Sequence, residues 1–295
     1  MAALPNTSED KRRLVGRLSL TAAIMTVGLI TYGAWVRASG SGLGCPDWPL
    51  CEGGVLPELE GDTAIEFGHR LYAGMTMLVV AVAAWFAYRG RRSDSVLAWI
   101  VMGAFGAILF QAALGGATVL TELDGQVRLA HLSVALLTLA LLTAGAVRGL
   151  EITGSIYPGV RLSGLFLAVA AFVVLAGGSL VASDLGPACP GLPLCDERSA
   201  TDAAWLHGTH RIAATLFLLG LVGVAVWMRK HHGTTLATVL NHGTATLIVI
   251  QIGVGVVAVA QILPMELRVL HLGIATFIWW GVVTQWLLAL RGRTL

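Results

Sequence analysis

Long apolar runs separated by short polar segments make up most of this 295-residue chain. An apolar run of about 20 residues is long enough to cross the hydrocarbon core of a bilayer as an α-helix. Runs of this length occur at roughly 17–37, 66–88, 96–121, 127–148, 162–182, 204–228, 237–262 and 267–290. They predict an all-α polytopic membrane protein with eight transmembrane helices.

The composition supports a membrane protein, because 56% of the residues are hydrophobic and only 12% are charged. Soluble domains carry about 25% charged residues. The chain opens with the polar and basic segment MAALPNTSEDKRRLVGR, and the apolar run after it lacks a small-residue cleavage site. We therefore expect the first helix to stay in the mature protein instead of being removed as a signal peptide.

Lysine and arginine residues are distributed unevenly between the two sides of the predicted bundle. Eight spans place both termini on one side, and that side carries 13 of the 19 basic residues: Lys11, Arg12, Arg13, Arg17, Arg89, Arg91, Arg92, Arg148, Arg161, Arg229, Lys230, Arg291 and Arg293. Basic residues mark the cytoplasmic side, so we expect cytoplasmic termini in a cell-membrane protein. The basic residues form no separate patch, which argues against nucleic-acid binding.

The chain matches itself at an offset of 140 to 144 residues. Three motifs recur: CPDWPLC at 45–51 with CPGLPLC at 189–195, HR at 69–70 with 210–211, and VRLAHL at 127–132 with LRVLHL at 267–272. Four spans return the chain to its starting side, so the repeat is a parallel one. We expect two four-helix bundles, residues 1–150 and 151–295, related by a pseudo-twofold axis along the membrane normal.

The four cysteines lie in two predicted outer loops, 38–65 and 183–203. Disulfides persist on the outer face of a membrane. Five residues including two prolines separate the cysteines of each pair, a loop that a disulfide could close. Four-cysteine zinc sites use tighter spacing. We therefore favour the disulfides Cys45–Cys51 and Cys189–Cys195 over a metal–thiolate site.

Four histidines lie at matched depth, each about one turn inside the outer end of an even-numbered span: His69, His131, His210 and His271. A single intramembrane histidine most often bonds a neighbouring helix, but ionisable residues within spans are costly and tend to mark function. Two opposed imidazoles in a bundle core suit the axial positions of a heme iron. The pattern therefore predicts one bis-histidine site in each half.

The other histidines receive different interpretations. His231 and His232 lie in a basic cytoplasmic loop and are expected to be solvated, and His242 is expected at the membrane interface. No role is assigned to His207.

Arginines accompany the four histidines at fixed spacing. Arg70 and Arg211 directly follow a histidine, whereas Arg128 and Arg268 precede one by three residues and share its helix face. Guanidinium groups suit carboxylates, so these four are candidate contacts for heme propionates, with anchoring of helix orientation as the alternative. Arg37 has no arginine counterpart in the second half, so any role it has belongs to the first half.

The two halves differ at one position of the histidine motif. EFGHR at 66–70 faces HGTHR at 207–211, so Glu66 is replaced by His207. Glu66 precedes His69 by three residues and shares its face, where a carboxylate could move protons or stabilise a cation. An acid in the first turn of a helix is also favoured by the helix dipole. The sequence leaves these two interpretations of Glu66 open.

Taken together, GSGLGCPDWPLC, CPGLPLC, EFGHR, GTHR and the two later histidines resemble the heme A synthase family. The resemblance implies a membrane oxidoreductase that oxidises the C8 methyl of heme O to a formyl group by successive hydroxylations, giving heme A for terminal oxidases. It implies that the first half holds heme O and the second half holds a heme b cofactor.

The resemblance also implies roles for individual residues. His69 and His131 would bind heme O with Arg70, Arg128 and Arg37, and Glu66 would be catalytic. His210 and His271 would be the axial ligands of heme b, with Arg211 and Arg268 on its propionates. The implied partners are heme O, heme A and the lipid bilayer; the heme O synthase, an electron acceptor or donor and a second copy of the chain are left open.

Two other classes of function remain at this stage. A di-heme b cytochrome would carry electrons without chemistry on the porphyrin, and a heme transporter would need alternating access without a permanently bound heme. The lone acid Glu66 favours the enzyme, because an enzyme needs different substrate and cofactor halves.

Overall fold

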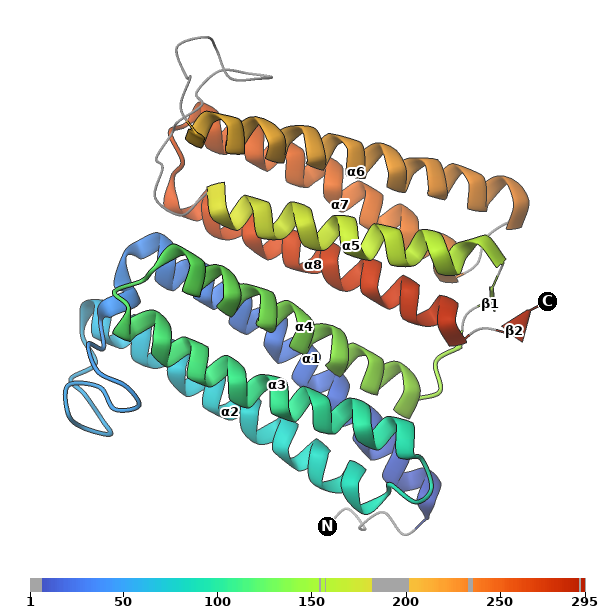
Figure 1. Ribbon diagram of the computed structural model, residues 1–295, viewed down its shortest axis with the longest axis horizontal. Coiled ribbons are helices and arrows are strands. Elements are labelled where there is room, and N and C mark those ends of the chain that lie inside the picture. The colour runs from blue at the N-terminus through green and yellow to red at the C-terminus, as the bar shows by residue number, and fades with distance from the viewer. Residues whose placement is uncertain are drawn as a thin grey trace. The chain divides into compact units, whose positions relative to one another are not determined.

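The computed structural model describes residues 7–153, 155–156, 158–181, 202–232, 236–291 and 293–294. Eight long helices account for nearly all of these residues (Figure 1): α1 (Ser8–Ser39), α2 (Gly61–Arg89), α3 (Ser95–Leu120), α4 (Gly125–Gly149), α5 (Pro158–Val181), α6 (Asp202–His232), α7 (Leu236–Ala260) and α8 (Met265–Arg291). A 3-10 turn, η1 (Ser41–Leu43), follows α1, and two-residue strands β1 (Ser155–Ile156) and β2 (Arg293–Thr294) pair in parallel. The predicted all-α class is confirmed.

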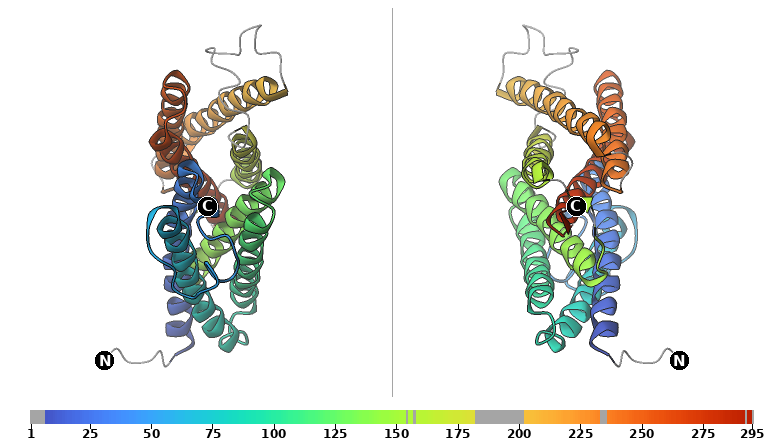
Figure 2. Two further views of the ribbon diagram at one scale, coloured as in Figure 1. Left: turned by 90° about the vertical axis from the view of Figure 1, so that its left-hand side faces the viewer. Right: turned by 90° about the vertical axis from the view of Figure 1, so that its right-hand side faces the viewer.

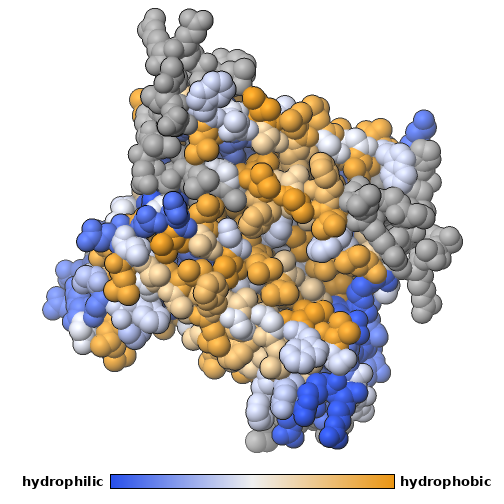
Figure 3. Space-filling model, viewed as in Figure 1, coloured by the Kyte–Doolittle hydropathy of each residue, from blue (hydrophilic) through white to orange (hydrophobic). Residues whose placement is uncertain are grey.

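Seven of the helices are long and apolar enough to cross a membrane. The eighth, α5, has 24 residues, and its described apolar stretch is Gly164–Leu175. Large hydrophobic side chains are exposed along the helices, and on the face shown in Figure 3 they gather over the middle of the helices. Apolar residues facing outward over whole helices indicate a lipid surface, so the multi-pass membrane fold predicted from the sequence is confirmed.

The chain divides into two compact units, Met1–Thr153 and Gly154–Leu295, called unit 1 and unit 2 below. In unit 1 each helix packs mainly against two neighbours, in the cyclic order α1, α2, α3, α4, and unit 2 has the same cyclic order for α5 to α8. Figure 2 gives two further views of these helices. In each ring the second and fourth helices lie diagonally across from one another. The pseudo-twofold axis stays a prediction.

The internal repeat extends to the backbone of the turns that connect α3 with α4 and α7 with α8. Residues 122–123 have φ values of 51° and 66°, and residues 262–263, displaced by 140 positions, have 60° and 58°. The second residue of each pair donates its amide N–H to the carbonyl five residues earlier, at 2.8 Å in one turn and 2.7 Å in the other. Left-handed pairs are costly for residues other than glycine, so their recurrence supports a structural duplication.

Small residues allow α1 and α4 to approach closely in unit 1. A Cβ atom at Gly16 would lie 2.7 Å from the backbone of Gly149, and one at Gly145 would lie 2.9 Å from the Ser19 hydroxyl. Close approach through small residues is the usual way in which helices associate within membranes. At this end of unit 1, Arg148 also holds Asp94 through Nε at 2.9 Å from each carboxylate oxygen.

Candidate functional site

The four predicted ligand histidines occupy matched positions on the second and fourth helix of each unit. His69 and His210 each follow the first residue of their helix, Gly61 or Asp202, by eight positions. His131 and His271 each lie six positions after the start of α4 and α8. The helices begin earlier than the apolar runs indicate, so the histidines lie about two turns inside instead of about one. The difference arises because polar first turns continue each helix beyond its apolar run.

Each histidine ring packs against a glycine on the preceding helix. The four pairs are His69 with Gly33, His131 with Gly115, His210 with Gly178 and His271 with Gly255. A Cβ atom on the glycine would lie 2.8 to 3.4 Å from the Cε1 atom of the ring. The glycines therefore give each imidazole room against the neighbouring backbone. The sequence carried the signal for this, because these glycines recur at offsets of 145 and 140, but it did not say what they contact.

The Nδ1 atoms of all four histidines are buried and have no hydrogen-bond partner among the described residues. Buried polar atoms in proteins are nearly always paired, so four orphaned ring nitrogens indicate side chains prepared for a ligand. His69 interacts electrostatically with His131, and His271 interacts with His210. Within each unit the two imidazoles are therefore near one another. Two imidazoles without a thiolate or carboxylate between them fit the axial ligand set of a heme iron.

Glu66 forms an ion pair with Arg70 inside unit 1. Arg70 Nε donates to Glu66 Oε1 at 2.9 Å, and Glu66 is only 6% exposed. Glu66 is the sixth residue of α2, whose first turn contains Asp62 instead. The effect of the helix dipole falls off within the first turn, so the position of Glu66 is not that of a dipole partner. At the matched position of unit 2, His207 is 7% exposed and interacts electrostatically with His210.

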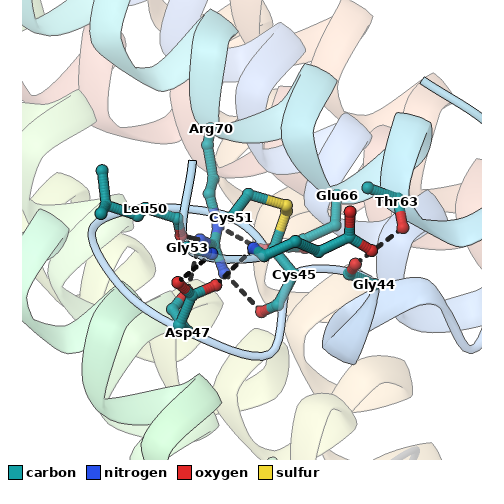
Figure 4. The surroundings of a disulfide bond; sticks show 10 residues. Gly44, Cys45, Asp47, Leu50, Cys51, Gly53, Thr63, Glu66 and Arg70 are labelled. Atoms are coloured by element: carbon teal, nitrogen blue, oxygen red, sulfur yellow. Dashed lines mark hydrogen bonds and ion pairs between the residues drawn. A yellow bond between two sulfur atoms is a disulfide. The ribbon is translucent and has the colours of Figure 1, made fainter. Parts of the chain in front are cut away.

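The other nitrogens of Arg70 bind the loop that carries the first cysteine pair (Figure 4). Nη1 donates to Asp47 O and to Leu50 O, both at 2.8 Å, and Nη2 donates to Cys45 O at 2.9 Å. Arg70 therefore joins the loop to Glu66. Sequence reasoning missed this role, because the carbonyl partners are backbone atoms and leave no trace in residue identity.

The predicted disulfide between Cys45 and Cys51 is present, with an S–S distance of 1.95 Å. Cys189 and Cys195 lie outside the described residues. The Asp47 carboxylate accepts the amide N–H groups of Gly53 at 2.9 Å and Glu52 at 2.7 Å. These bonds, with that of Gly53 the most effective, hold the pKa of the Asp47 carboxyl below its usual value.

The segment from Ser41 to Gly54, called the disulfide loop below, rests on two helices of unit 1. Thr63 of α2 donates its hydroxyl to Gly44 O at 2.9 Å. Trp48 packs against Gly116 of α3, where a Cβ atom would meet its ring at 2.6 Å. Gly116 is adjacent to Gly115, which contacts His131. The disulfide loop therefore covers the end of unit 1 at which the histidines and Glu66 lie.

The remaining predicted arginines are half-buried. Arg37 lies in the last turn of α1, whereas the others lie near the first residues of their helices: Arg128 on α4, Arg211 on α6 and Arg268 on α8. The predicted contacts of Arg128, Arg211 and Arg268 with heme propionates, and of Arg37 with the substrate heme, stay predictions. In unit 2, Gln251 of α7 donates its side-chain amide to His271 O at 2.8 Å. This bond ties α7 to α8 beside the fourth histidine.

Three comparisons with known proteins bear on this arrangement. A family model described as COX15-CtaA, cytochrome oxidase assembly protein, matches residues 16–283. The chain is 32% identical to a heme A synthase of Symbiobacterium thermophilum, over 89% of this chain and 90% of that relative. It is 33% identical to a heme A synthase of Shouchella clausii, over 79% of this chain and 82% of that relative.

Proposed function

This chain belongs to the heme A synthase family, and we propose that it oxidises the C8 methyl group of heme O to a formyl group by successive hydroxylations. Unit 1 is the substrate half in this proposal, and unit 2 is the cofactor half. The family makes the protein an enzyme of heme A biosynthesis, and the seven long apolar helices among its described residues agree with a substrate that dissolves in lipid.

The observation that carries the proposal is the buried Glu66 carboxylate. Glu66 lies three residues before His69, and Arg70 holds its carboxylate. Oxidation at a methyl carbon breaks a C–H bond, and a positioned carboxylate is a suitable acceptor for the proton when the electrons pass to the electron acceptor of the reaction. The matched residue of unit 2 is His207, so only unit 1 has this carboxylate. The asymmetry is what a substrate half and a cofactor half require.

His69 and His131 hold heme O in unit 1, and His210 and His271 are the axial ligands of a heme b in unit 2. The orphaned Nδ1 atoms and the close glycines support this assignment, because each of the four histidines has a buried ring nitrogen without a hydrogen bond and packs against a glycine. When bound, heme b supplies one-electron redox chemistry. Arg128 and Arg37 contribute to substrate binding, and Arg211 and Arg268 bind the propionates of heme b.

The test is to express the full chain in cells that make heme O, purify it, and identify the extracted hemes by chromatography and mass. Heme A with heme b supports the proposal. Heme b alone, with heme O unchanged in the cells, would identify an electron-carrying cytochrome instead. Cells that carry the vector without the gene provide the background level of heme A.

A further inference from the structure

We propose that Arg70 is a positioning residue that links the disulfide loop to Glu66, so that the closed loop sets the orientation of the catalytic carboxylate. The inference rests on the proposed function, because Glu66 is the group being positioned. It goes beyond that function, because the disulfide loop would act on Glu66 through Arg70 without touching the substrate.

The geometry of Arg70 supports this link. A guanidinium group has five N–H donors in one plane, and four of them are used: one on Glu66 and three on carbonyls of the disulfide loop. The three carbonyls belong to Cys45, Asp47 and Leu50, all within the ring that the disulfide closes. The loop carbonyls thus accept three hydrogen bonds from the guanidinium, and Glu66 accepts the fourth.

The disulfide is what keeps these three carbonyls together. Converging carbonyl oxygens repel one another, and their arrangement is stable because the guanidinium provides the opposite charge and the cross-link limits the loop. Lysine has no planar fork of donors and offers a single point charge. A lysine at residue 70 would not satisfy the loop and Glu66 together.

Glu66 in turn depends on Arg70. A buried carboxylate is costly unless it is paired and hydrogen-bonded, and Arg70 Nε is the partner found for Glu66. Glu66 lies one helical turn before Arg70, in the favourable order of acid before base. With four donors already used, Arg70 would have to give up a loop carbonyl to hold both oxygens of a heme propionate, so its first role is structural support of Glu66.

A double-mutant cycle on the full chain tests the link. The variants are Arg70→Gln, the pair Cys45→Ser with Cys51→Ser, and all three changes combined. A misplacement of about 1 Å costs on the order of a hundredfold in rate, so we expect each to lower kcat for heme A formation by about tenfold to a hundredfold, with a smaller change in KM for heme O. Because both act through one contact, the combined variant should be no slower than the slower of the two.

Arg89→Gln is the matched control, because Arg89 lies at the opposite end of α2 and stacks on Trp85. It should retain the wild-type rate. Effects of Arg70 and the cysteines that multiply in the combined variant would overturn the proposal, as would a normal kcat in Arg70→Gln.

Chemical rescue provides a second test. Arg70→Ala removes the cation but leaves the loop carbonyls and Glu66, so guanidinium chloride at millimolar concentration should restore part of the rate. The same addition should have no effect on Arg70→Ala combined with Glu66→Gln. An Arg70→Lys variant as active as wild type would contradict the need for a planar fork.

Accessibility of the disulfide separates failure of this link from failure of the proposed function. After mild reduction, maleimide labelling of Cys45 and Cys51 measures how readily the loop opens, without any heme chemistry. Arg70→Gln should be labelled at least about tenfold faster than wild type, since hydrogen bonds to charged groups are each worth about 1.5–3 kcal/mol. Equal labelling would overturn the link even if heme A is made. Faster labelling of Arg70→Gln, together with a wild-type protein that makes no heme A, would retain the loop contact and reject the function.

Discussion

The imidazole of His210 lies so close to Gly178 that a methyl group on Gly178 would approach the ring to 2.8 Å. Real Cβ atoms do not make contacts this short, so the ring and the glycine are fitted to each other. The same relationship recurs at the other three histidines, with more room at each. This fit makes the glycines sensitive probes of the histidine sites.

Gly178→Ala should displace the His210 ring and remove most of the stable heme b, read as loss of the low-spin band in a reduced-minus-oxidised spectrum. Alanine favours a helix by about 0.5–1 kcal/mol over glycine, so helix instability does not explain a loss. Gly177→Ala is the matched control, because a Cβ atom there meets nothing within 4 Å among the described residues. Equal heme b in both variants would show that the ring position does not matter.

Glu66→Gln keeps the shape of the side chain but cannot ionise. General acid–base groups contribute about 10²–10⁴-fold, so heme A formation should fall at least about a hundredfold, with heme O or a hydroxylated intermediate retained. The measurement is chromatography of the extracted hemes. His207→Gln in unit 2 serves as the comparison. Near-normal heme A in Glu66→Gln would remove the assigned catalytic role.

His210→Ala or His271→Ala should each abolish the low-spin heme b spectrum, because a bis-histidine site loses one axial nitrogen. Comparison with His242→Ala, on α7 and outside the predicted ligand set, controls for the general loss of a membrane histidine. An unchanged band in both ligand variants would exclude these residues as ligands.

Low pH should release the turn that Asp47 holds. The folded pKa of Asp47 lies below its usual value, so the carboxylate's contribution is present above the unfolded pKa and is lost as the pH falls through the folded one. Amide hydrogen exchange at Glu52 and Gly53 should be slower in wild type than in Asp47→Asn at pH 6. The two should converge as the pH falls below about 4. A constant difference down to low pH would contradict this role for Asp47.

Cys189 and Cys195 should form a second disulfide in the purified protein, because the loop repeats the spacing of the first pair. Peptide mapping without reduction should recover two linked pairs and no free thiol. Recovery of alkylated Cys189 from the unreduced protein would disprove the second disulfide.

Much of the fold could be predicted from the sequence. A bilayer requires apolar runs of about 20 residues, and the eight helices follow from them directly. Helix starts were less accurate, since α2 begins with Gly61, Asp62 and Thr63, which lie outside the apolar run. That difference matters for function, because it moves Glu66 beyond the first turn and away from the simplest dipole interpretation.

The internal repeat was also sufficient to predict the candidate ligands. Binding a heme iron requires particular side chains, and histidines recur at matched depth in both halves. What only the tertiary structure decided is which groups meet: Arg70 with the carbonyls of Cys45, Asp47 and Leu50, and His210 with Gly178. The physical reason is that these contacts involve backbone atoms and the absence of a Cβ atom, and residue types alone do not specify which distant backbone comes within reach.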